Sequence, residues 1–275
     1  MHEDLLAVAV DAARIGGEIL TRLYGSTDLG AEEKAKNDLV SRADRESETA
    51  IVAHILGAFP DHSILAEEGG HQPGAREGFE WIIDPLDGTA NFLRGVPMFC
   101  VSIACVEHGR PIAAAVLDPL RDDLFTATRG GGAWRGSTPL RLRDRPGLDG
   151  AFLATGFPFR AHGAIDTYLT LFREIFLEAR GIRRCGAAAL DLAYTAAGVF
   201  DGFFEFRLAP WDVAAGSLLV EEAGGVITDL DGGDRFIAGG NILAGLPGVH
   251  RRLREIATRH VSEALLDRMV PAQGG

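Results

Sequence analysis

The sequence feature that most constrains the fold is a change of pattern near the middle of the chain. Between Met98 and Leu142, short apolar stretches alternate with turn residues such as Gly109, Pro119 and Gly130. Closely spaced strands joined by short turns predict an antiparallel meander. Beyond residue 150, strand-like and helical stretches alternate instead, which is typical of an α/β arrangement. The chain therefore predicts a layered α/β (α+β) protein made of two different halves.

The expected elements follow from these patterns. Apolar residues at helical spacing predict a first helix over 3–24 and a second over 45–58, which stops before Pro60. Strands of the first half are expected at 63–66, 79–83, 98–106, 111–117, 123–128 and 133–135. In the second half we expect strands at 151–155, 201–206 and 225–229, and helices at 165–180, 187–199, 213–223 and 248–267. The polar, turn-rich stretch 143–150 is the predicted boundary between halves 1–145 and 146–275.

Composition excludes several classes of protein. With 275 residues, 47% of them hydrophobic and 24% charged, the chain has the make-up of a globular protein. The net charge of -12 argues against broad nucleic-acid binding, although a bound metal ion would still allow an anionic substrate. No apolar run is long enough for a membrane span, and the acidic N-terminus lacks a secretory signal. Three cysteines without CxxC spacing fit a reducing compartment, so we expect a cytoplasmic protein.

The strongest chemical signal is the run Asp84-Pro85-Leu86-Asp87-Gly88-Thr89. A buried strand is expected to end at Asp84, and Pro85 fixes the next φ angle, so that the turn can bring Asp87 back beside Asp84. Two carboxylates on one tight turn repel each other unless a cation lies between them. Because all these ligands are oxygens, Mg²⁺ is the first expectation and Mn²⁺ the second.

The two residues after Asp87 suit a phosphate. Gly88 allows backbone N–H groups to approach a ligand closely, and Thr89 offers a hydroxyl where a helix is expected to begin. The alternative is an acidic loop in which Asp87 is an ordinary helix N-cap. That alternative fits the complete strand–turn–helix arrangement less well.

Three other acidic positions have an ordinary structural explanation as well as a functional one. Glu67 and Glu68 follow an expected strand and would usually form a solvated turn, but a metal site needs carboxylates from a neighbouring strand end. Asp212 stands where a helix N-cap belongs. Ser41 and Asp44 have the spacing of a capping box. On local grounds the structural explanation is favoured for each of the three.

Several catalytic signatures are missing from the sequence. The chain contains neither the Gly-x-Ser-x-Gly elbow of acyl hydrolases nor the Gly-x-x-x-x-Gly-Lys loop of nucleotide-binding proteins. Cys105 and Arg110 lack the spacing of a cysteine phosphatase, and Asp84 and Asp87 lack that of an aspartyl-phosphate phosphatase. A covalent nucleophile is therefore not expected, and metal-activated water is the mechanism that remains.

All of these acidic clusters match one family in the same order along the chain. The sequence resembles the inositol monophosphatases, part of the lithium-sensitive phosphatase superfamily that includes fructose bisphosphatases. The matching segments are DLVSRAD (38–44), AEEGG (66–70), WIIDPLDGTANF (81–92), CGAAALDLAY (185–194) and PWDVAAGSLLVEEAGG (210–225). The resemblance implies a layered αβαβα sandwich with an N-terminal mixed or antiparallel half, a C-terminal α/β half, the active site between them, and a homodimer.

The resemblance also implies roles for individual residues. Metal binding falls to Glu67, Asp84, the Leu86 backbone carbonyl, Asp87 and Asp212, which together would hold two to three Mg²⁺ ions. Asp44 and Thr89, with Glu67, form the implied catalytic set, in which Asp44 and Thr89 polarise the attacking water. The implied substrate contacts are Asp87, Gly88, Thr89, Gly186, Ala187, Ala188, Glu205 and Asp212. A lysine that many relatives carry before the DLV segment has two competing counterparts here, Lys34 and Lys36.

The leading expectation for function is the Mg²⁺-dependent hydrolysis of myo-inositol monophosphate to inositol and phosphate. Related esters are the alternative: histidinol phosphate, a sugar bisphosphate or a nucleotide 3′-phosphate. A different class of function is a non-catalytic role in RNA or transcription assemblies, as in some relatives. The acidic balance and the complete carboxylate set argue against that class.

Overall fold

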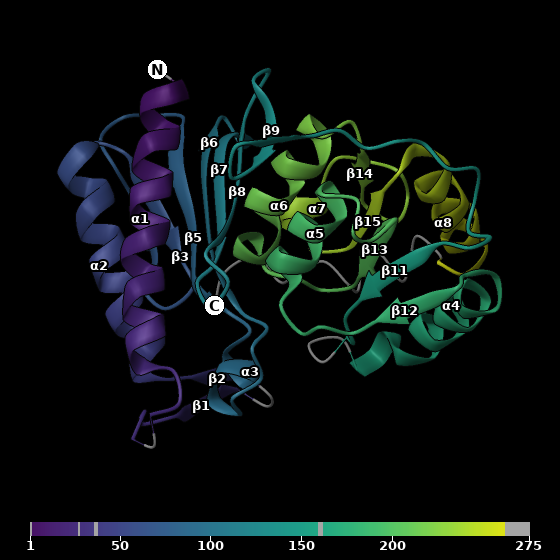
Figure 1. Ribbon diagram of the computed structural model, residues 1–275, viewed down its shortest axis with the longest axis horizontal. Helices are drawn as coiled ribbons and strands as arrows, with labels where there is room; N and C mark the ends of the chain where they lie inside the picture. Colours follow the sequence, from purple (N-terminus) through teal and green to yellow (C-terminus); the bar gives the residue numbers. More distant parts are fainter. Residues whose placement is uncertain (1, 27, 36–37, 159–161, 262–275) are drawn as a thin grey trace.

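The computed structural model describes residues 2–26, 28–35, 38–158 and 162–261. Five layers follow one another across the molecule in Figure 1. They are helices α1 (His2–Leu23) and α2 (Arg42–Ala58), an eight-stranded sheet, helices α5 (Ala188–Ala196) and α6 (Pro210–Glu222), a five-stranded sheet, and helices α4 (Ile165–Glu178) and α8 (Pro247–His260). This layering confirms the predicted αβαβα sandwich.

The eight-stranded sheet contains the predicted meander. Its order is β10-β9-β8-β7-β6-β5-β3-β4, and every neighbouring pair is antiparallel except β3 and β5, which run parallel. The bounds are β3 (Ser63–Ala66), β4 (Gly70–Gln72), β5 (Phe79–Asp87), β6 (Cys100–Glu107), β7 (Arg110–Asp118), β8 (Asp123–Thr128), β9 (Gly132–Arg135) and β10 (Thr138–Leu140). The short edge strands β4 and β10 were not predicted from the sequence.

The five-stranded sheet is mixed, with the order β12-β11-β13-β15-β14. The strand β11 pairs in parallel with β12 and β13, whereas β15 pairs antiparallel with β13 and β14. The bounds are β11 (Phe152–Thr155), β12 (Gly181–Arg183), β13 (Gly202–Glu205), β14 (Val226–Thr228) and β15 (Ile242–Gly245). The strands β11, β13 and β14 were predicted, and β12 and β15 were not.

The predicted helices are present with shifted ends. The helix α2 begins at Arg42 because Ser41 is its N-cap, and α6 begins at Pro210, whose fixed φ angle suits the first turn of a helix. The helix α8 ends at His260, and residues 262–267 of its predicted range lie outside the described residues. Shorter elements are the hairpin of β1 (Glu32–Ala35) and β2 (Asp38–Val40), helices α3 (Thr89–Leu93) and α7 (Phe236–Gly239), and the 3₁₀ turn His162–Ala164.

The central core lies between the two sheets, around α5 and α6. Most residues of these two helices are buried, since one sheet covers each side of the pair. Their apolar side chains pack against Ile82 and Val116 of the first sheet and against Phe203 and Ala244 of the second. Among the described residues, no helix is long and apolar enough to cross a membrane. The shared core fixes the position of one sheet's strand ends relative to the helices that face them.

Candidate active site

The strand β5 is interrupted where its acidic residues lie. Pro85 cannot donate a ladder hydrogen bond, and the pairing of β5 with β6 is irregular between Asp84 and Asp87. In a regular strand, residues three apart point to opposite faces, so the irregularity is what allows both carboxylates to turn toward the same place. Asp84 and Asp87 are 1% and 8% exposed. Asp84 Oδ1 accepts a hydrogen bond from the Leu86 backbone N–H at 3.0 Å.

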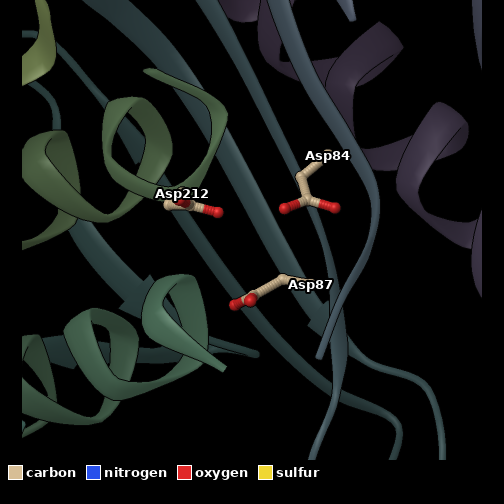
Figure 2. Close-up of side chains that lie close together, drawn as sticks. All are labelled: Asp84, Asp87 and Asp212. Carbon is tan, nitrogen blue, oxygen red and sulfur yellow. The ribbon is translucent and has the colours of Figure 1, made fainter. Parts of the chain in front are cut away.

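A third carboxylate comes from α6. Asp84, Asp87 and Asp212 each offer an oxygen within 4.8 Å of the others, and Figure 2 shows the three side chains converging. The expectation that Asp212 is an N-cap was wrong. The helix begins at Pro210 after Ala209, and Asp212 lies in the first turn, where its Oδ2 accepts from the Ala209 N–H at 2.7 Å. The first turn of a helix favours a negative charge, so this position is compatible with a ligand role.

Glu67 faces this cluster from the end of β3. Its backbone N–H donates to Ile83 O at 3.2 Å, which ties it to β5. Burial raises the pKa of the Glu67 carboxyl to about 8, and the negative charges of Asp212 and Glu68 act in the same direction. Lys34 opposes this rise, since its Nζ donates to Glu67 Oε1 at 3.2 Å and to Glu68 Oε1 at 2.6 Å. Lys34 is thus a lysine that reaches the site, and Lys36 lies outside the described residues.

The electrostatics of the cluster fit a divalent cation. Burial raises the pKa of Asp87 to about 7, with the charge of Asp212 adding to the effect. Burial also raises the pKa of Asp84 well above its ordinary value. The negative charges of Glu67, Asp87 and Asp212 raise it further. Carboxylates that repel one another in a buried place become favourable when a hard cation lies among them. Because every donor is an oxygen, the residues present suit Mg²⁺, with Mn²⁺ as the second choice.

Asp44 forms the predicted capping box and also contacts Thr89, two residues after Asp87. Its Oδ2 accepts from the Ser41 N–H at 2.8 Å and from Ser41 Oγ at 2.6 Å. Its other oxygen, Oδ1, lies 2.8 Å from Thr89 Oγ1, which is also 3.1 Å from Leu86 O. Burial raises the pKa of Asp44. The capping box and the contact with Thr89 are compatible, because each uses a different oxygen of Asp44.

Gly88 joins β5 to the short helix α3. Its φ angle of 96° lies in the left-handed region, and an added Cβ would come within 2.9 Å of Met98 O. The position therefore requires glycine for two independent reasons. It leaves Gly88 and Thr89 at the wall of a cavity of about 350 Å³ that Asp84, Asp87 and Glu67 also line.

The opposite wall of this cavity comes from the second half of the chain. The predicted residues Gly186, Ala187 and Ala188 line it where the chain enters α5, and Glu205 lines it at the end of β13. The two walls are joined directly, since Asn91 Nδ2 donates to Met98 O at 2.7 Å and to Cys185 O at 2.9 Å. Burial raises the pKa of Glu205 well above its ordinary value, with Asp212 and Asp191 contributing.

Sequence reasoning missed several residues of this wall. Phe157, Arg184, Asp191 and Arg207 also line the cavity. Arg184 and Arg207 add positive charge to a site otherwise rich in carboxylates. Asp191 is 2% exposed and interrupts the apolar run Ala188-Ala189-Leu190-Asp191-Leu192. An isolated acidic residue within a buried apolar helix was the available signal for this position.

Comparison with known proteins identifies the family. A model described as the inositol monophosphatase family matches residues 1–265. The chain is 46% identical over 266 residues to the Nus factor SuhB of Escherichia coli K12, covering 96% of this chain and 99% of that protein. Among solved structures, the extragenic suppressor protein suhB from Bartonella henselae is 41% identical with a TM-score of 0.90, over 94% of this chain and 100% of that one.

A less similar solved structure is that of a relative bound to inositol monophosphate. Inositol monophosphate-bound SaIMPase-II, a staphylococcal protein, is 29% identical with a TM-score of 0.81, over 96% of this chain and 98% of that one. The shared fold extends over nearly the whole chain in each of these comparisons. Together with the family match and the acidic cluster between the layers, they lead to one conclusion. The chain belongs to the inositol monophosphatase family.

Proposed function

We propose that the protein hydrolyses a phosphate monoester with Mg²⁺, and that myo-inositol monophosphate is its preferred substrate. The observation that carries this proposal is the convergence of Asp84, Asp87 and Asp212 on one point, with Glu67 beside them, at a cavity that a small sugar phosphate would fill. The cavity volume of about 350 Å³ is within the range of small-molecule sites. The staphylococcal relative bound to inositol monophosphate supports the choice of substrate.

The metal ligands in this proposal are Glu67, Asp84, the Leu86 carbonyl, Asp87 and Asp212. Two to three Mg²⁺ ions would bind there, with Mn²⁺ as a substitute, and they would neutralise the phosphate and stabilise charge on the attacking and leaving oxygens. In this way a protein with a net charge of -12 can hold a dianionic ester.

Thr89 and Asp44 would handle the proton of the attacking water. The Thr89 hydroxyl donates toward Asp44 Oδ1, so its oxygen lone pairs remain available to accept a hydrogen bond from water. Asp44 does not need to be strongly basic, because it orients the threonine hydroxyl. Attack at phosphorus forms one P–O bond and breaks the ester P–O bond, and the departing alkoxide takes a proton to become the free alcohol.

The remaining residues would bind the two parts of the substrate. Backbone groups of Gly88 and Thr89 border the expected phosphate position. Gly186, Ala187, Ala188, Glu205 and Asp212 would face the polyol. Glu205 is suited to accept hydrogen bonds from ring hydroxyls.

A panel of phosphomonoesters tests the substrate. Purified protein with Mg²⁺ would be assayed against inositol 1-phosphate, histidinol phosphate, a sugar bisphosphate and a nucleotide 3′-phosphate. We expect inositol 1-phosphate to give the highest kcat/KM. A tenfold preference for another ester would contradict the choice of inositol 1-phosphate but leave the phosphatase proposal intact. If none of the esters released phosphate in a Mg²⁺-dependent manner, the phosphatase proposal would be wrong.

A second candidate function is a role in transcription assemblies. The identity of 46% with the Nus factor SuhB of Escherichia coli, over nearly the whole chain, favours it. The two functions are separable by experiment, since binding to a transcription assembly does not require turnover. Retention of Asp87→Asn on immobilised transcription complexes, as strong as that of the unaltered protein, would support the second function. No retention of the unaltered protein would exclude it.

We also propose a cytoplasmic homodimer that is inhibited by lithium, with a division into halves near residue 145. The halves are supported by the sheets, since the strands of the larger sheet end at Leu140 and those of the smaller begin at Phe152. The helix α4 supports dimerisation, because it exposes Leu169, Phe176 and Leu177. Light scattering would give the mass in solution, and a monomer at micromolar concentration would contradict the dimer.

A further inference from the structure

A buried carboxyl group at the substrate cavity lacks a full set of partners. Asp191, in α5, lines the cavity and is 2% exposed. Within the described residues, its Oδ1 has no hydrogen-bond partner. The groups that favour its ionised form are the Cys185 thiol and the positive charge of Arg184. An unpaired polar atom in a buried place is costly, and native proteins usually keep one only where a ligand or water completes it.

The position of Asp191 indicates which part of a substrate it would meet. Asp191 lies in the first turn of α5, and its N–H donates to Ala187 O at 2.9 Å. In the same turn, the Ala189 N–H donates to Asp87 Oδ2 at 2.8 Å. The wall that carries Asp191 also carries Gly186, Ala187 and Glu205. Asp191 therefore lies on the polyol side of the cavity, beside the acidic cluster but outside it.

The chemistry of Asp191 favours a hydroxyl group. Burial raises the pKa of Asp191 to about 8, so both of its protonation states are accessible near neutral pH. A hydroxyl both donates and accepts, so it can pair with a carboxylate or with a carboxylic acid. A second phosphate would repel the carboxylate. The terminal torsion of an aspartate is broad, so a small turn of the carboxyl group would present Oδ1 to the cavity.

We propose that Asp191 is a specificity-determining residue that binds a hydroxyl of the alcohol part of the substrate. This inference rests on the proposed phosphatase function and narrows its substrate class. The preferred substrate has hydroxyls that reach two acidic groups of the same wall, Glu205 at the end of β13 and Asp191 on α5. A monoester of a compact polyol with hydroxyls on several carbons meets this requirement, and an ester of a simple alcohol does not.

The test compares two substrates of the same shape. Inositol 1-phosphate and cyclohexyl phosphate share a six-membered ring and a phosphate, but only the first carries ring hydroxyls. We expect Asp191→Ala to lower kcat/KM for inositol 1-phosphate roughly 10- to 100-fold, as for loss of a hydrogen bond to a charged group. For cyclohexyl phosphate, we expect a change within about threefold, because no hydroxyl is present to lose a partner. Equal losses for both esters, or no loss for either, would overturn the inference.

Two further variants separate specificity from folding. Asp191→Asn keeps the shape and an acceptor oxygen, and it should recover most of the selectivity that Asp191→Ala loses; recovery of none would count against the proposal. Asp229→Asn removes a carboxylate that is 6% exposed and outside the cavity, and it should leave the ratio of the two substrates unchanged. A shifted ratio in Asp229→Asn would mean that the ratio reports general destabilisation, which would overturn the inference.

The outcome for the unaltered protein distinguishes the two proposals. If it hydrolyses neither these two esters nor any other phosphomonoester of the panel with Mg²⁺, the phosphatase function fails and the inference fails with it. If it hydrolyses both and Asp191→Ala affects them equally, only the inference fails. If Asp191→Ala selectively affects inositol 1-phosphate, monodeoxy inositol phosphates identify the hydroxyl, since the analogue that lacks it should be insensitive to Asp191→Ala. Sensitivity of every analogue would contradict the assignment.

Discussion

The carboxylate of Asp87, at the end of β5, accepts a hydrogen bond of 2.8 Å from the backbone N–H of Ala189, in the first turn of α5. The two residues are 102 positions apart, and the bond connects the metal-ligand side of the cavity with the polyol side. Asp87 thus belongs both to the acidic cluster and to the contact between the two layers. Changes at Asp87 should therefore affect activity and stability in separable ways.

Asp87→Asn should abolish activity and stabilise the protein in the absence of metal. We expect kcat to fall by roughly a thousandfold or more, because a charged ligand of the metal is lost. The amide oxygen can still accept from Ala189, and the repulsion with Asp212 disappears. Relief of about 1 kcal/mol would raise Tm by roughly 2–4 °C in a protein of this size. Phosphate release and thermal unfolding in chelator measure the two effects.

A buried carboxylate away from the cavity is the matched control for Asp87. Asp118 is 1% exposed, and its Oδ2 pairs with Arg121 at 2.5 Å. Asp118→Asn should lower Tm, because it weakens an ion pair without relieving repulsion, and should leave kcat within about twofold. If Asp87→Asn behaved like Asp118→Asn in both assays, Asp87 would not be a ligand.

Gly88→Ala should impair both folding and activity. The left-handed φ angle of 96° costs about 1–2 kcal/mol for a residue with a Cβ. The Cβ would also approach Met98 O, which would displace Thr89 from Asp44, so we expect kcat to fall at least tenfold. Gly95→Ala is the control, since Gly95 has a φ angle of 73° but open space around its Cβ position. It should lose stability without losing activity, and equal activity losses in both variants would contradict this account of Gly88.

His250 should make the protein sensitive to mild acid. Burial lowers the pKa of His250 to about 4, with Arg254 adding to the effect, and its Nε2 lies 2.9 Å from Thr228 Oγ1. Between pH 6.5, the ordinary pKa of histidine, and about pH 4, the unfolded chain binds a proton on His250 that the folded protein does not bind. This contribution is therefore fully present above pH 6.5 and is lost as the pH falls, by at most about 3 kcal/mol.

Denaturant unfolding at pH 7.5 and pH 5.5 in saturating Mg²⁺, which removes the opposing contribution of Glu67 and Asp87, measures this effect. Between pH 7.5 and pH 5.5, the free energy of unfolding of His250→Gln should fall by about 1 kcal/mol less than that of the unaltered protein. An equal loss in His250→Gln would show that other groups account for the acid sensitivity.

Much of the fold was predictable because local patterns and tertiary structure agree. The meander from β6 to β9 has alternating apolar stretches and turn residues, and α1 has apolar residues at helical spacing. The elements that were missed are short and lack such patterns. The strand β1 reads Glu-Glu-Lys-Ala, and β12 has three residues, Gly-Ile-Arg. Their conformation depends on pairing with a neighbour, which no local pattern reveals.

The sequence predicted which acidic residues form the cluster, but not which basic residue pairs with them. Asp87 ends β5, Glu67 directly follows β3 and Asp212 lies in the first turn of α6, where motifs are readable. The expectation that the strand ends at Asp84 was wrong, because β5 continues through an irregular stretch to Asp87. The contact between Lys34 and Glu67 depends on how the β1–β2 hairpin packs, and the sequence left Lys36 as an equal candidate. Asp191 was missed because its place at the cavity depends on how α5 packs, although the acidic residue within an apolar run was a readable signal. The Lys34 contact and the position of Asp191 depend on how distant segments pack together, which residue types alone do not reveal.

The most direct test of the account is calorimetric titration of chelator-stripped protein with Mg²⁺ at pH 7, in two buffers of different ionisation enthalpy. We expect Mg²⁺ to bind and to release protons, since burial raises the pKa of Glu67 to about 8 and that of Asp87 to about 7. Because these raised pKa values favour the proton-bound folded protein, metal-free stability should also fall as the pH rises from about 4.5 to 8, and Mg²⁺ should abolish that fall. Folded protein that takes up neither Mg²⁺ nor Mn²⁺, with or without phosphate, would contradict the central claim.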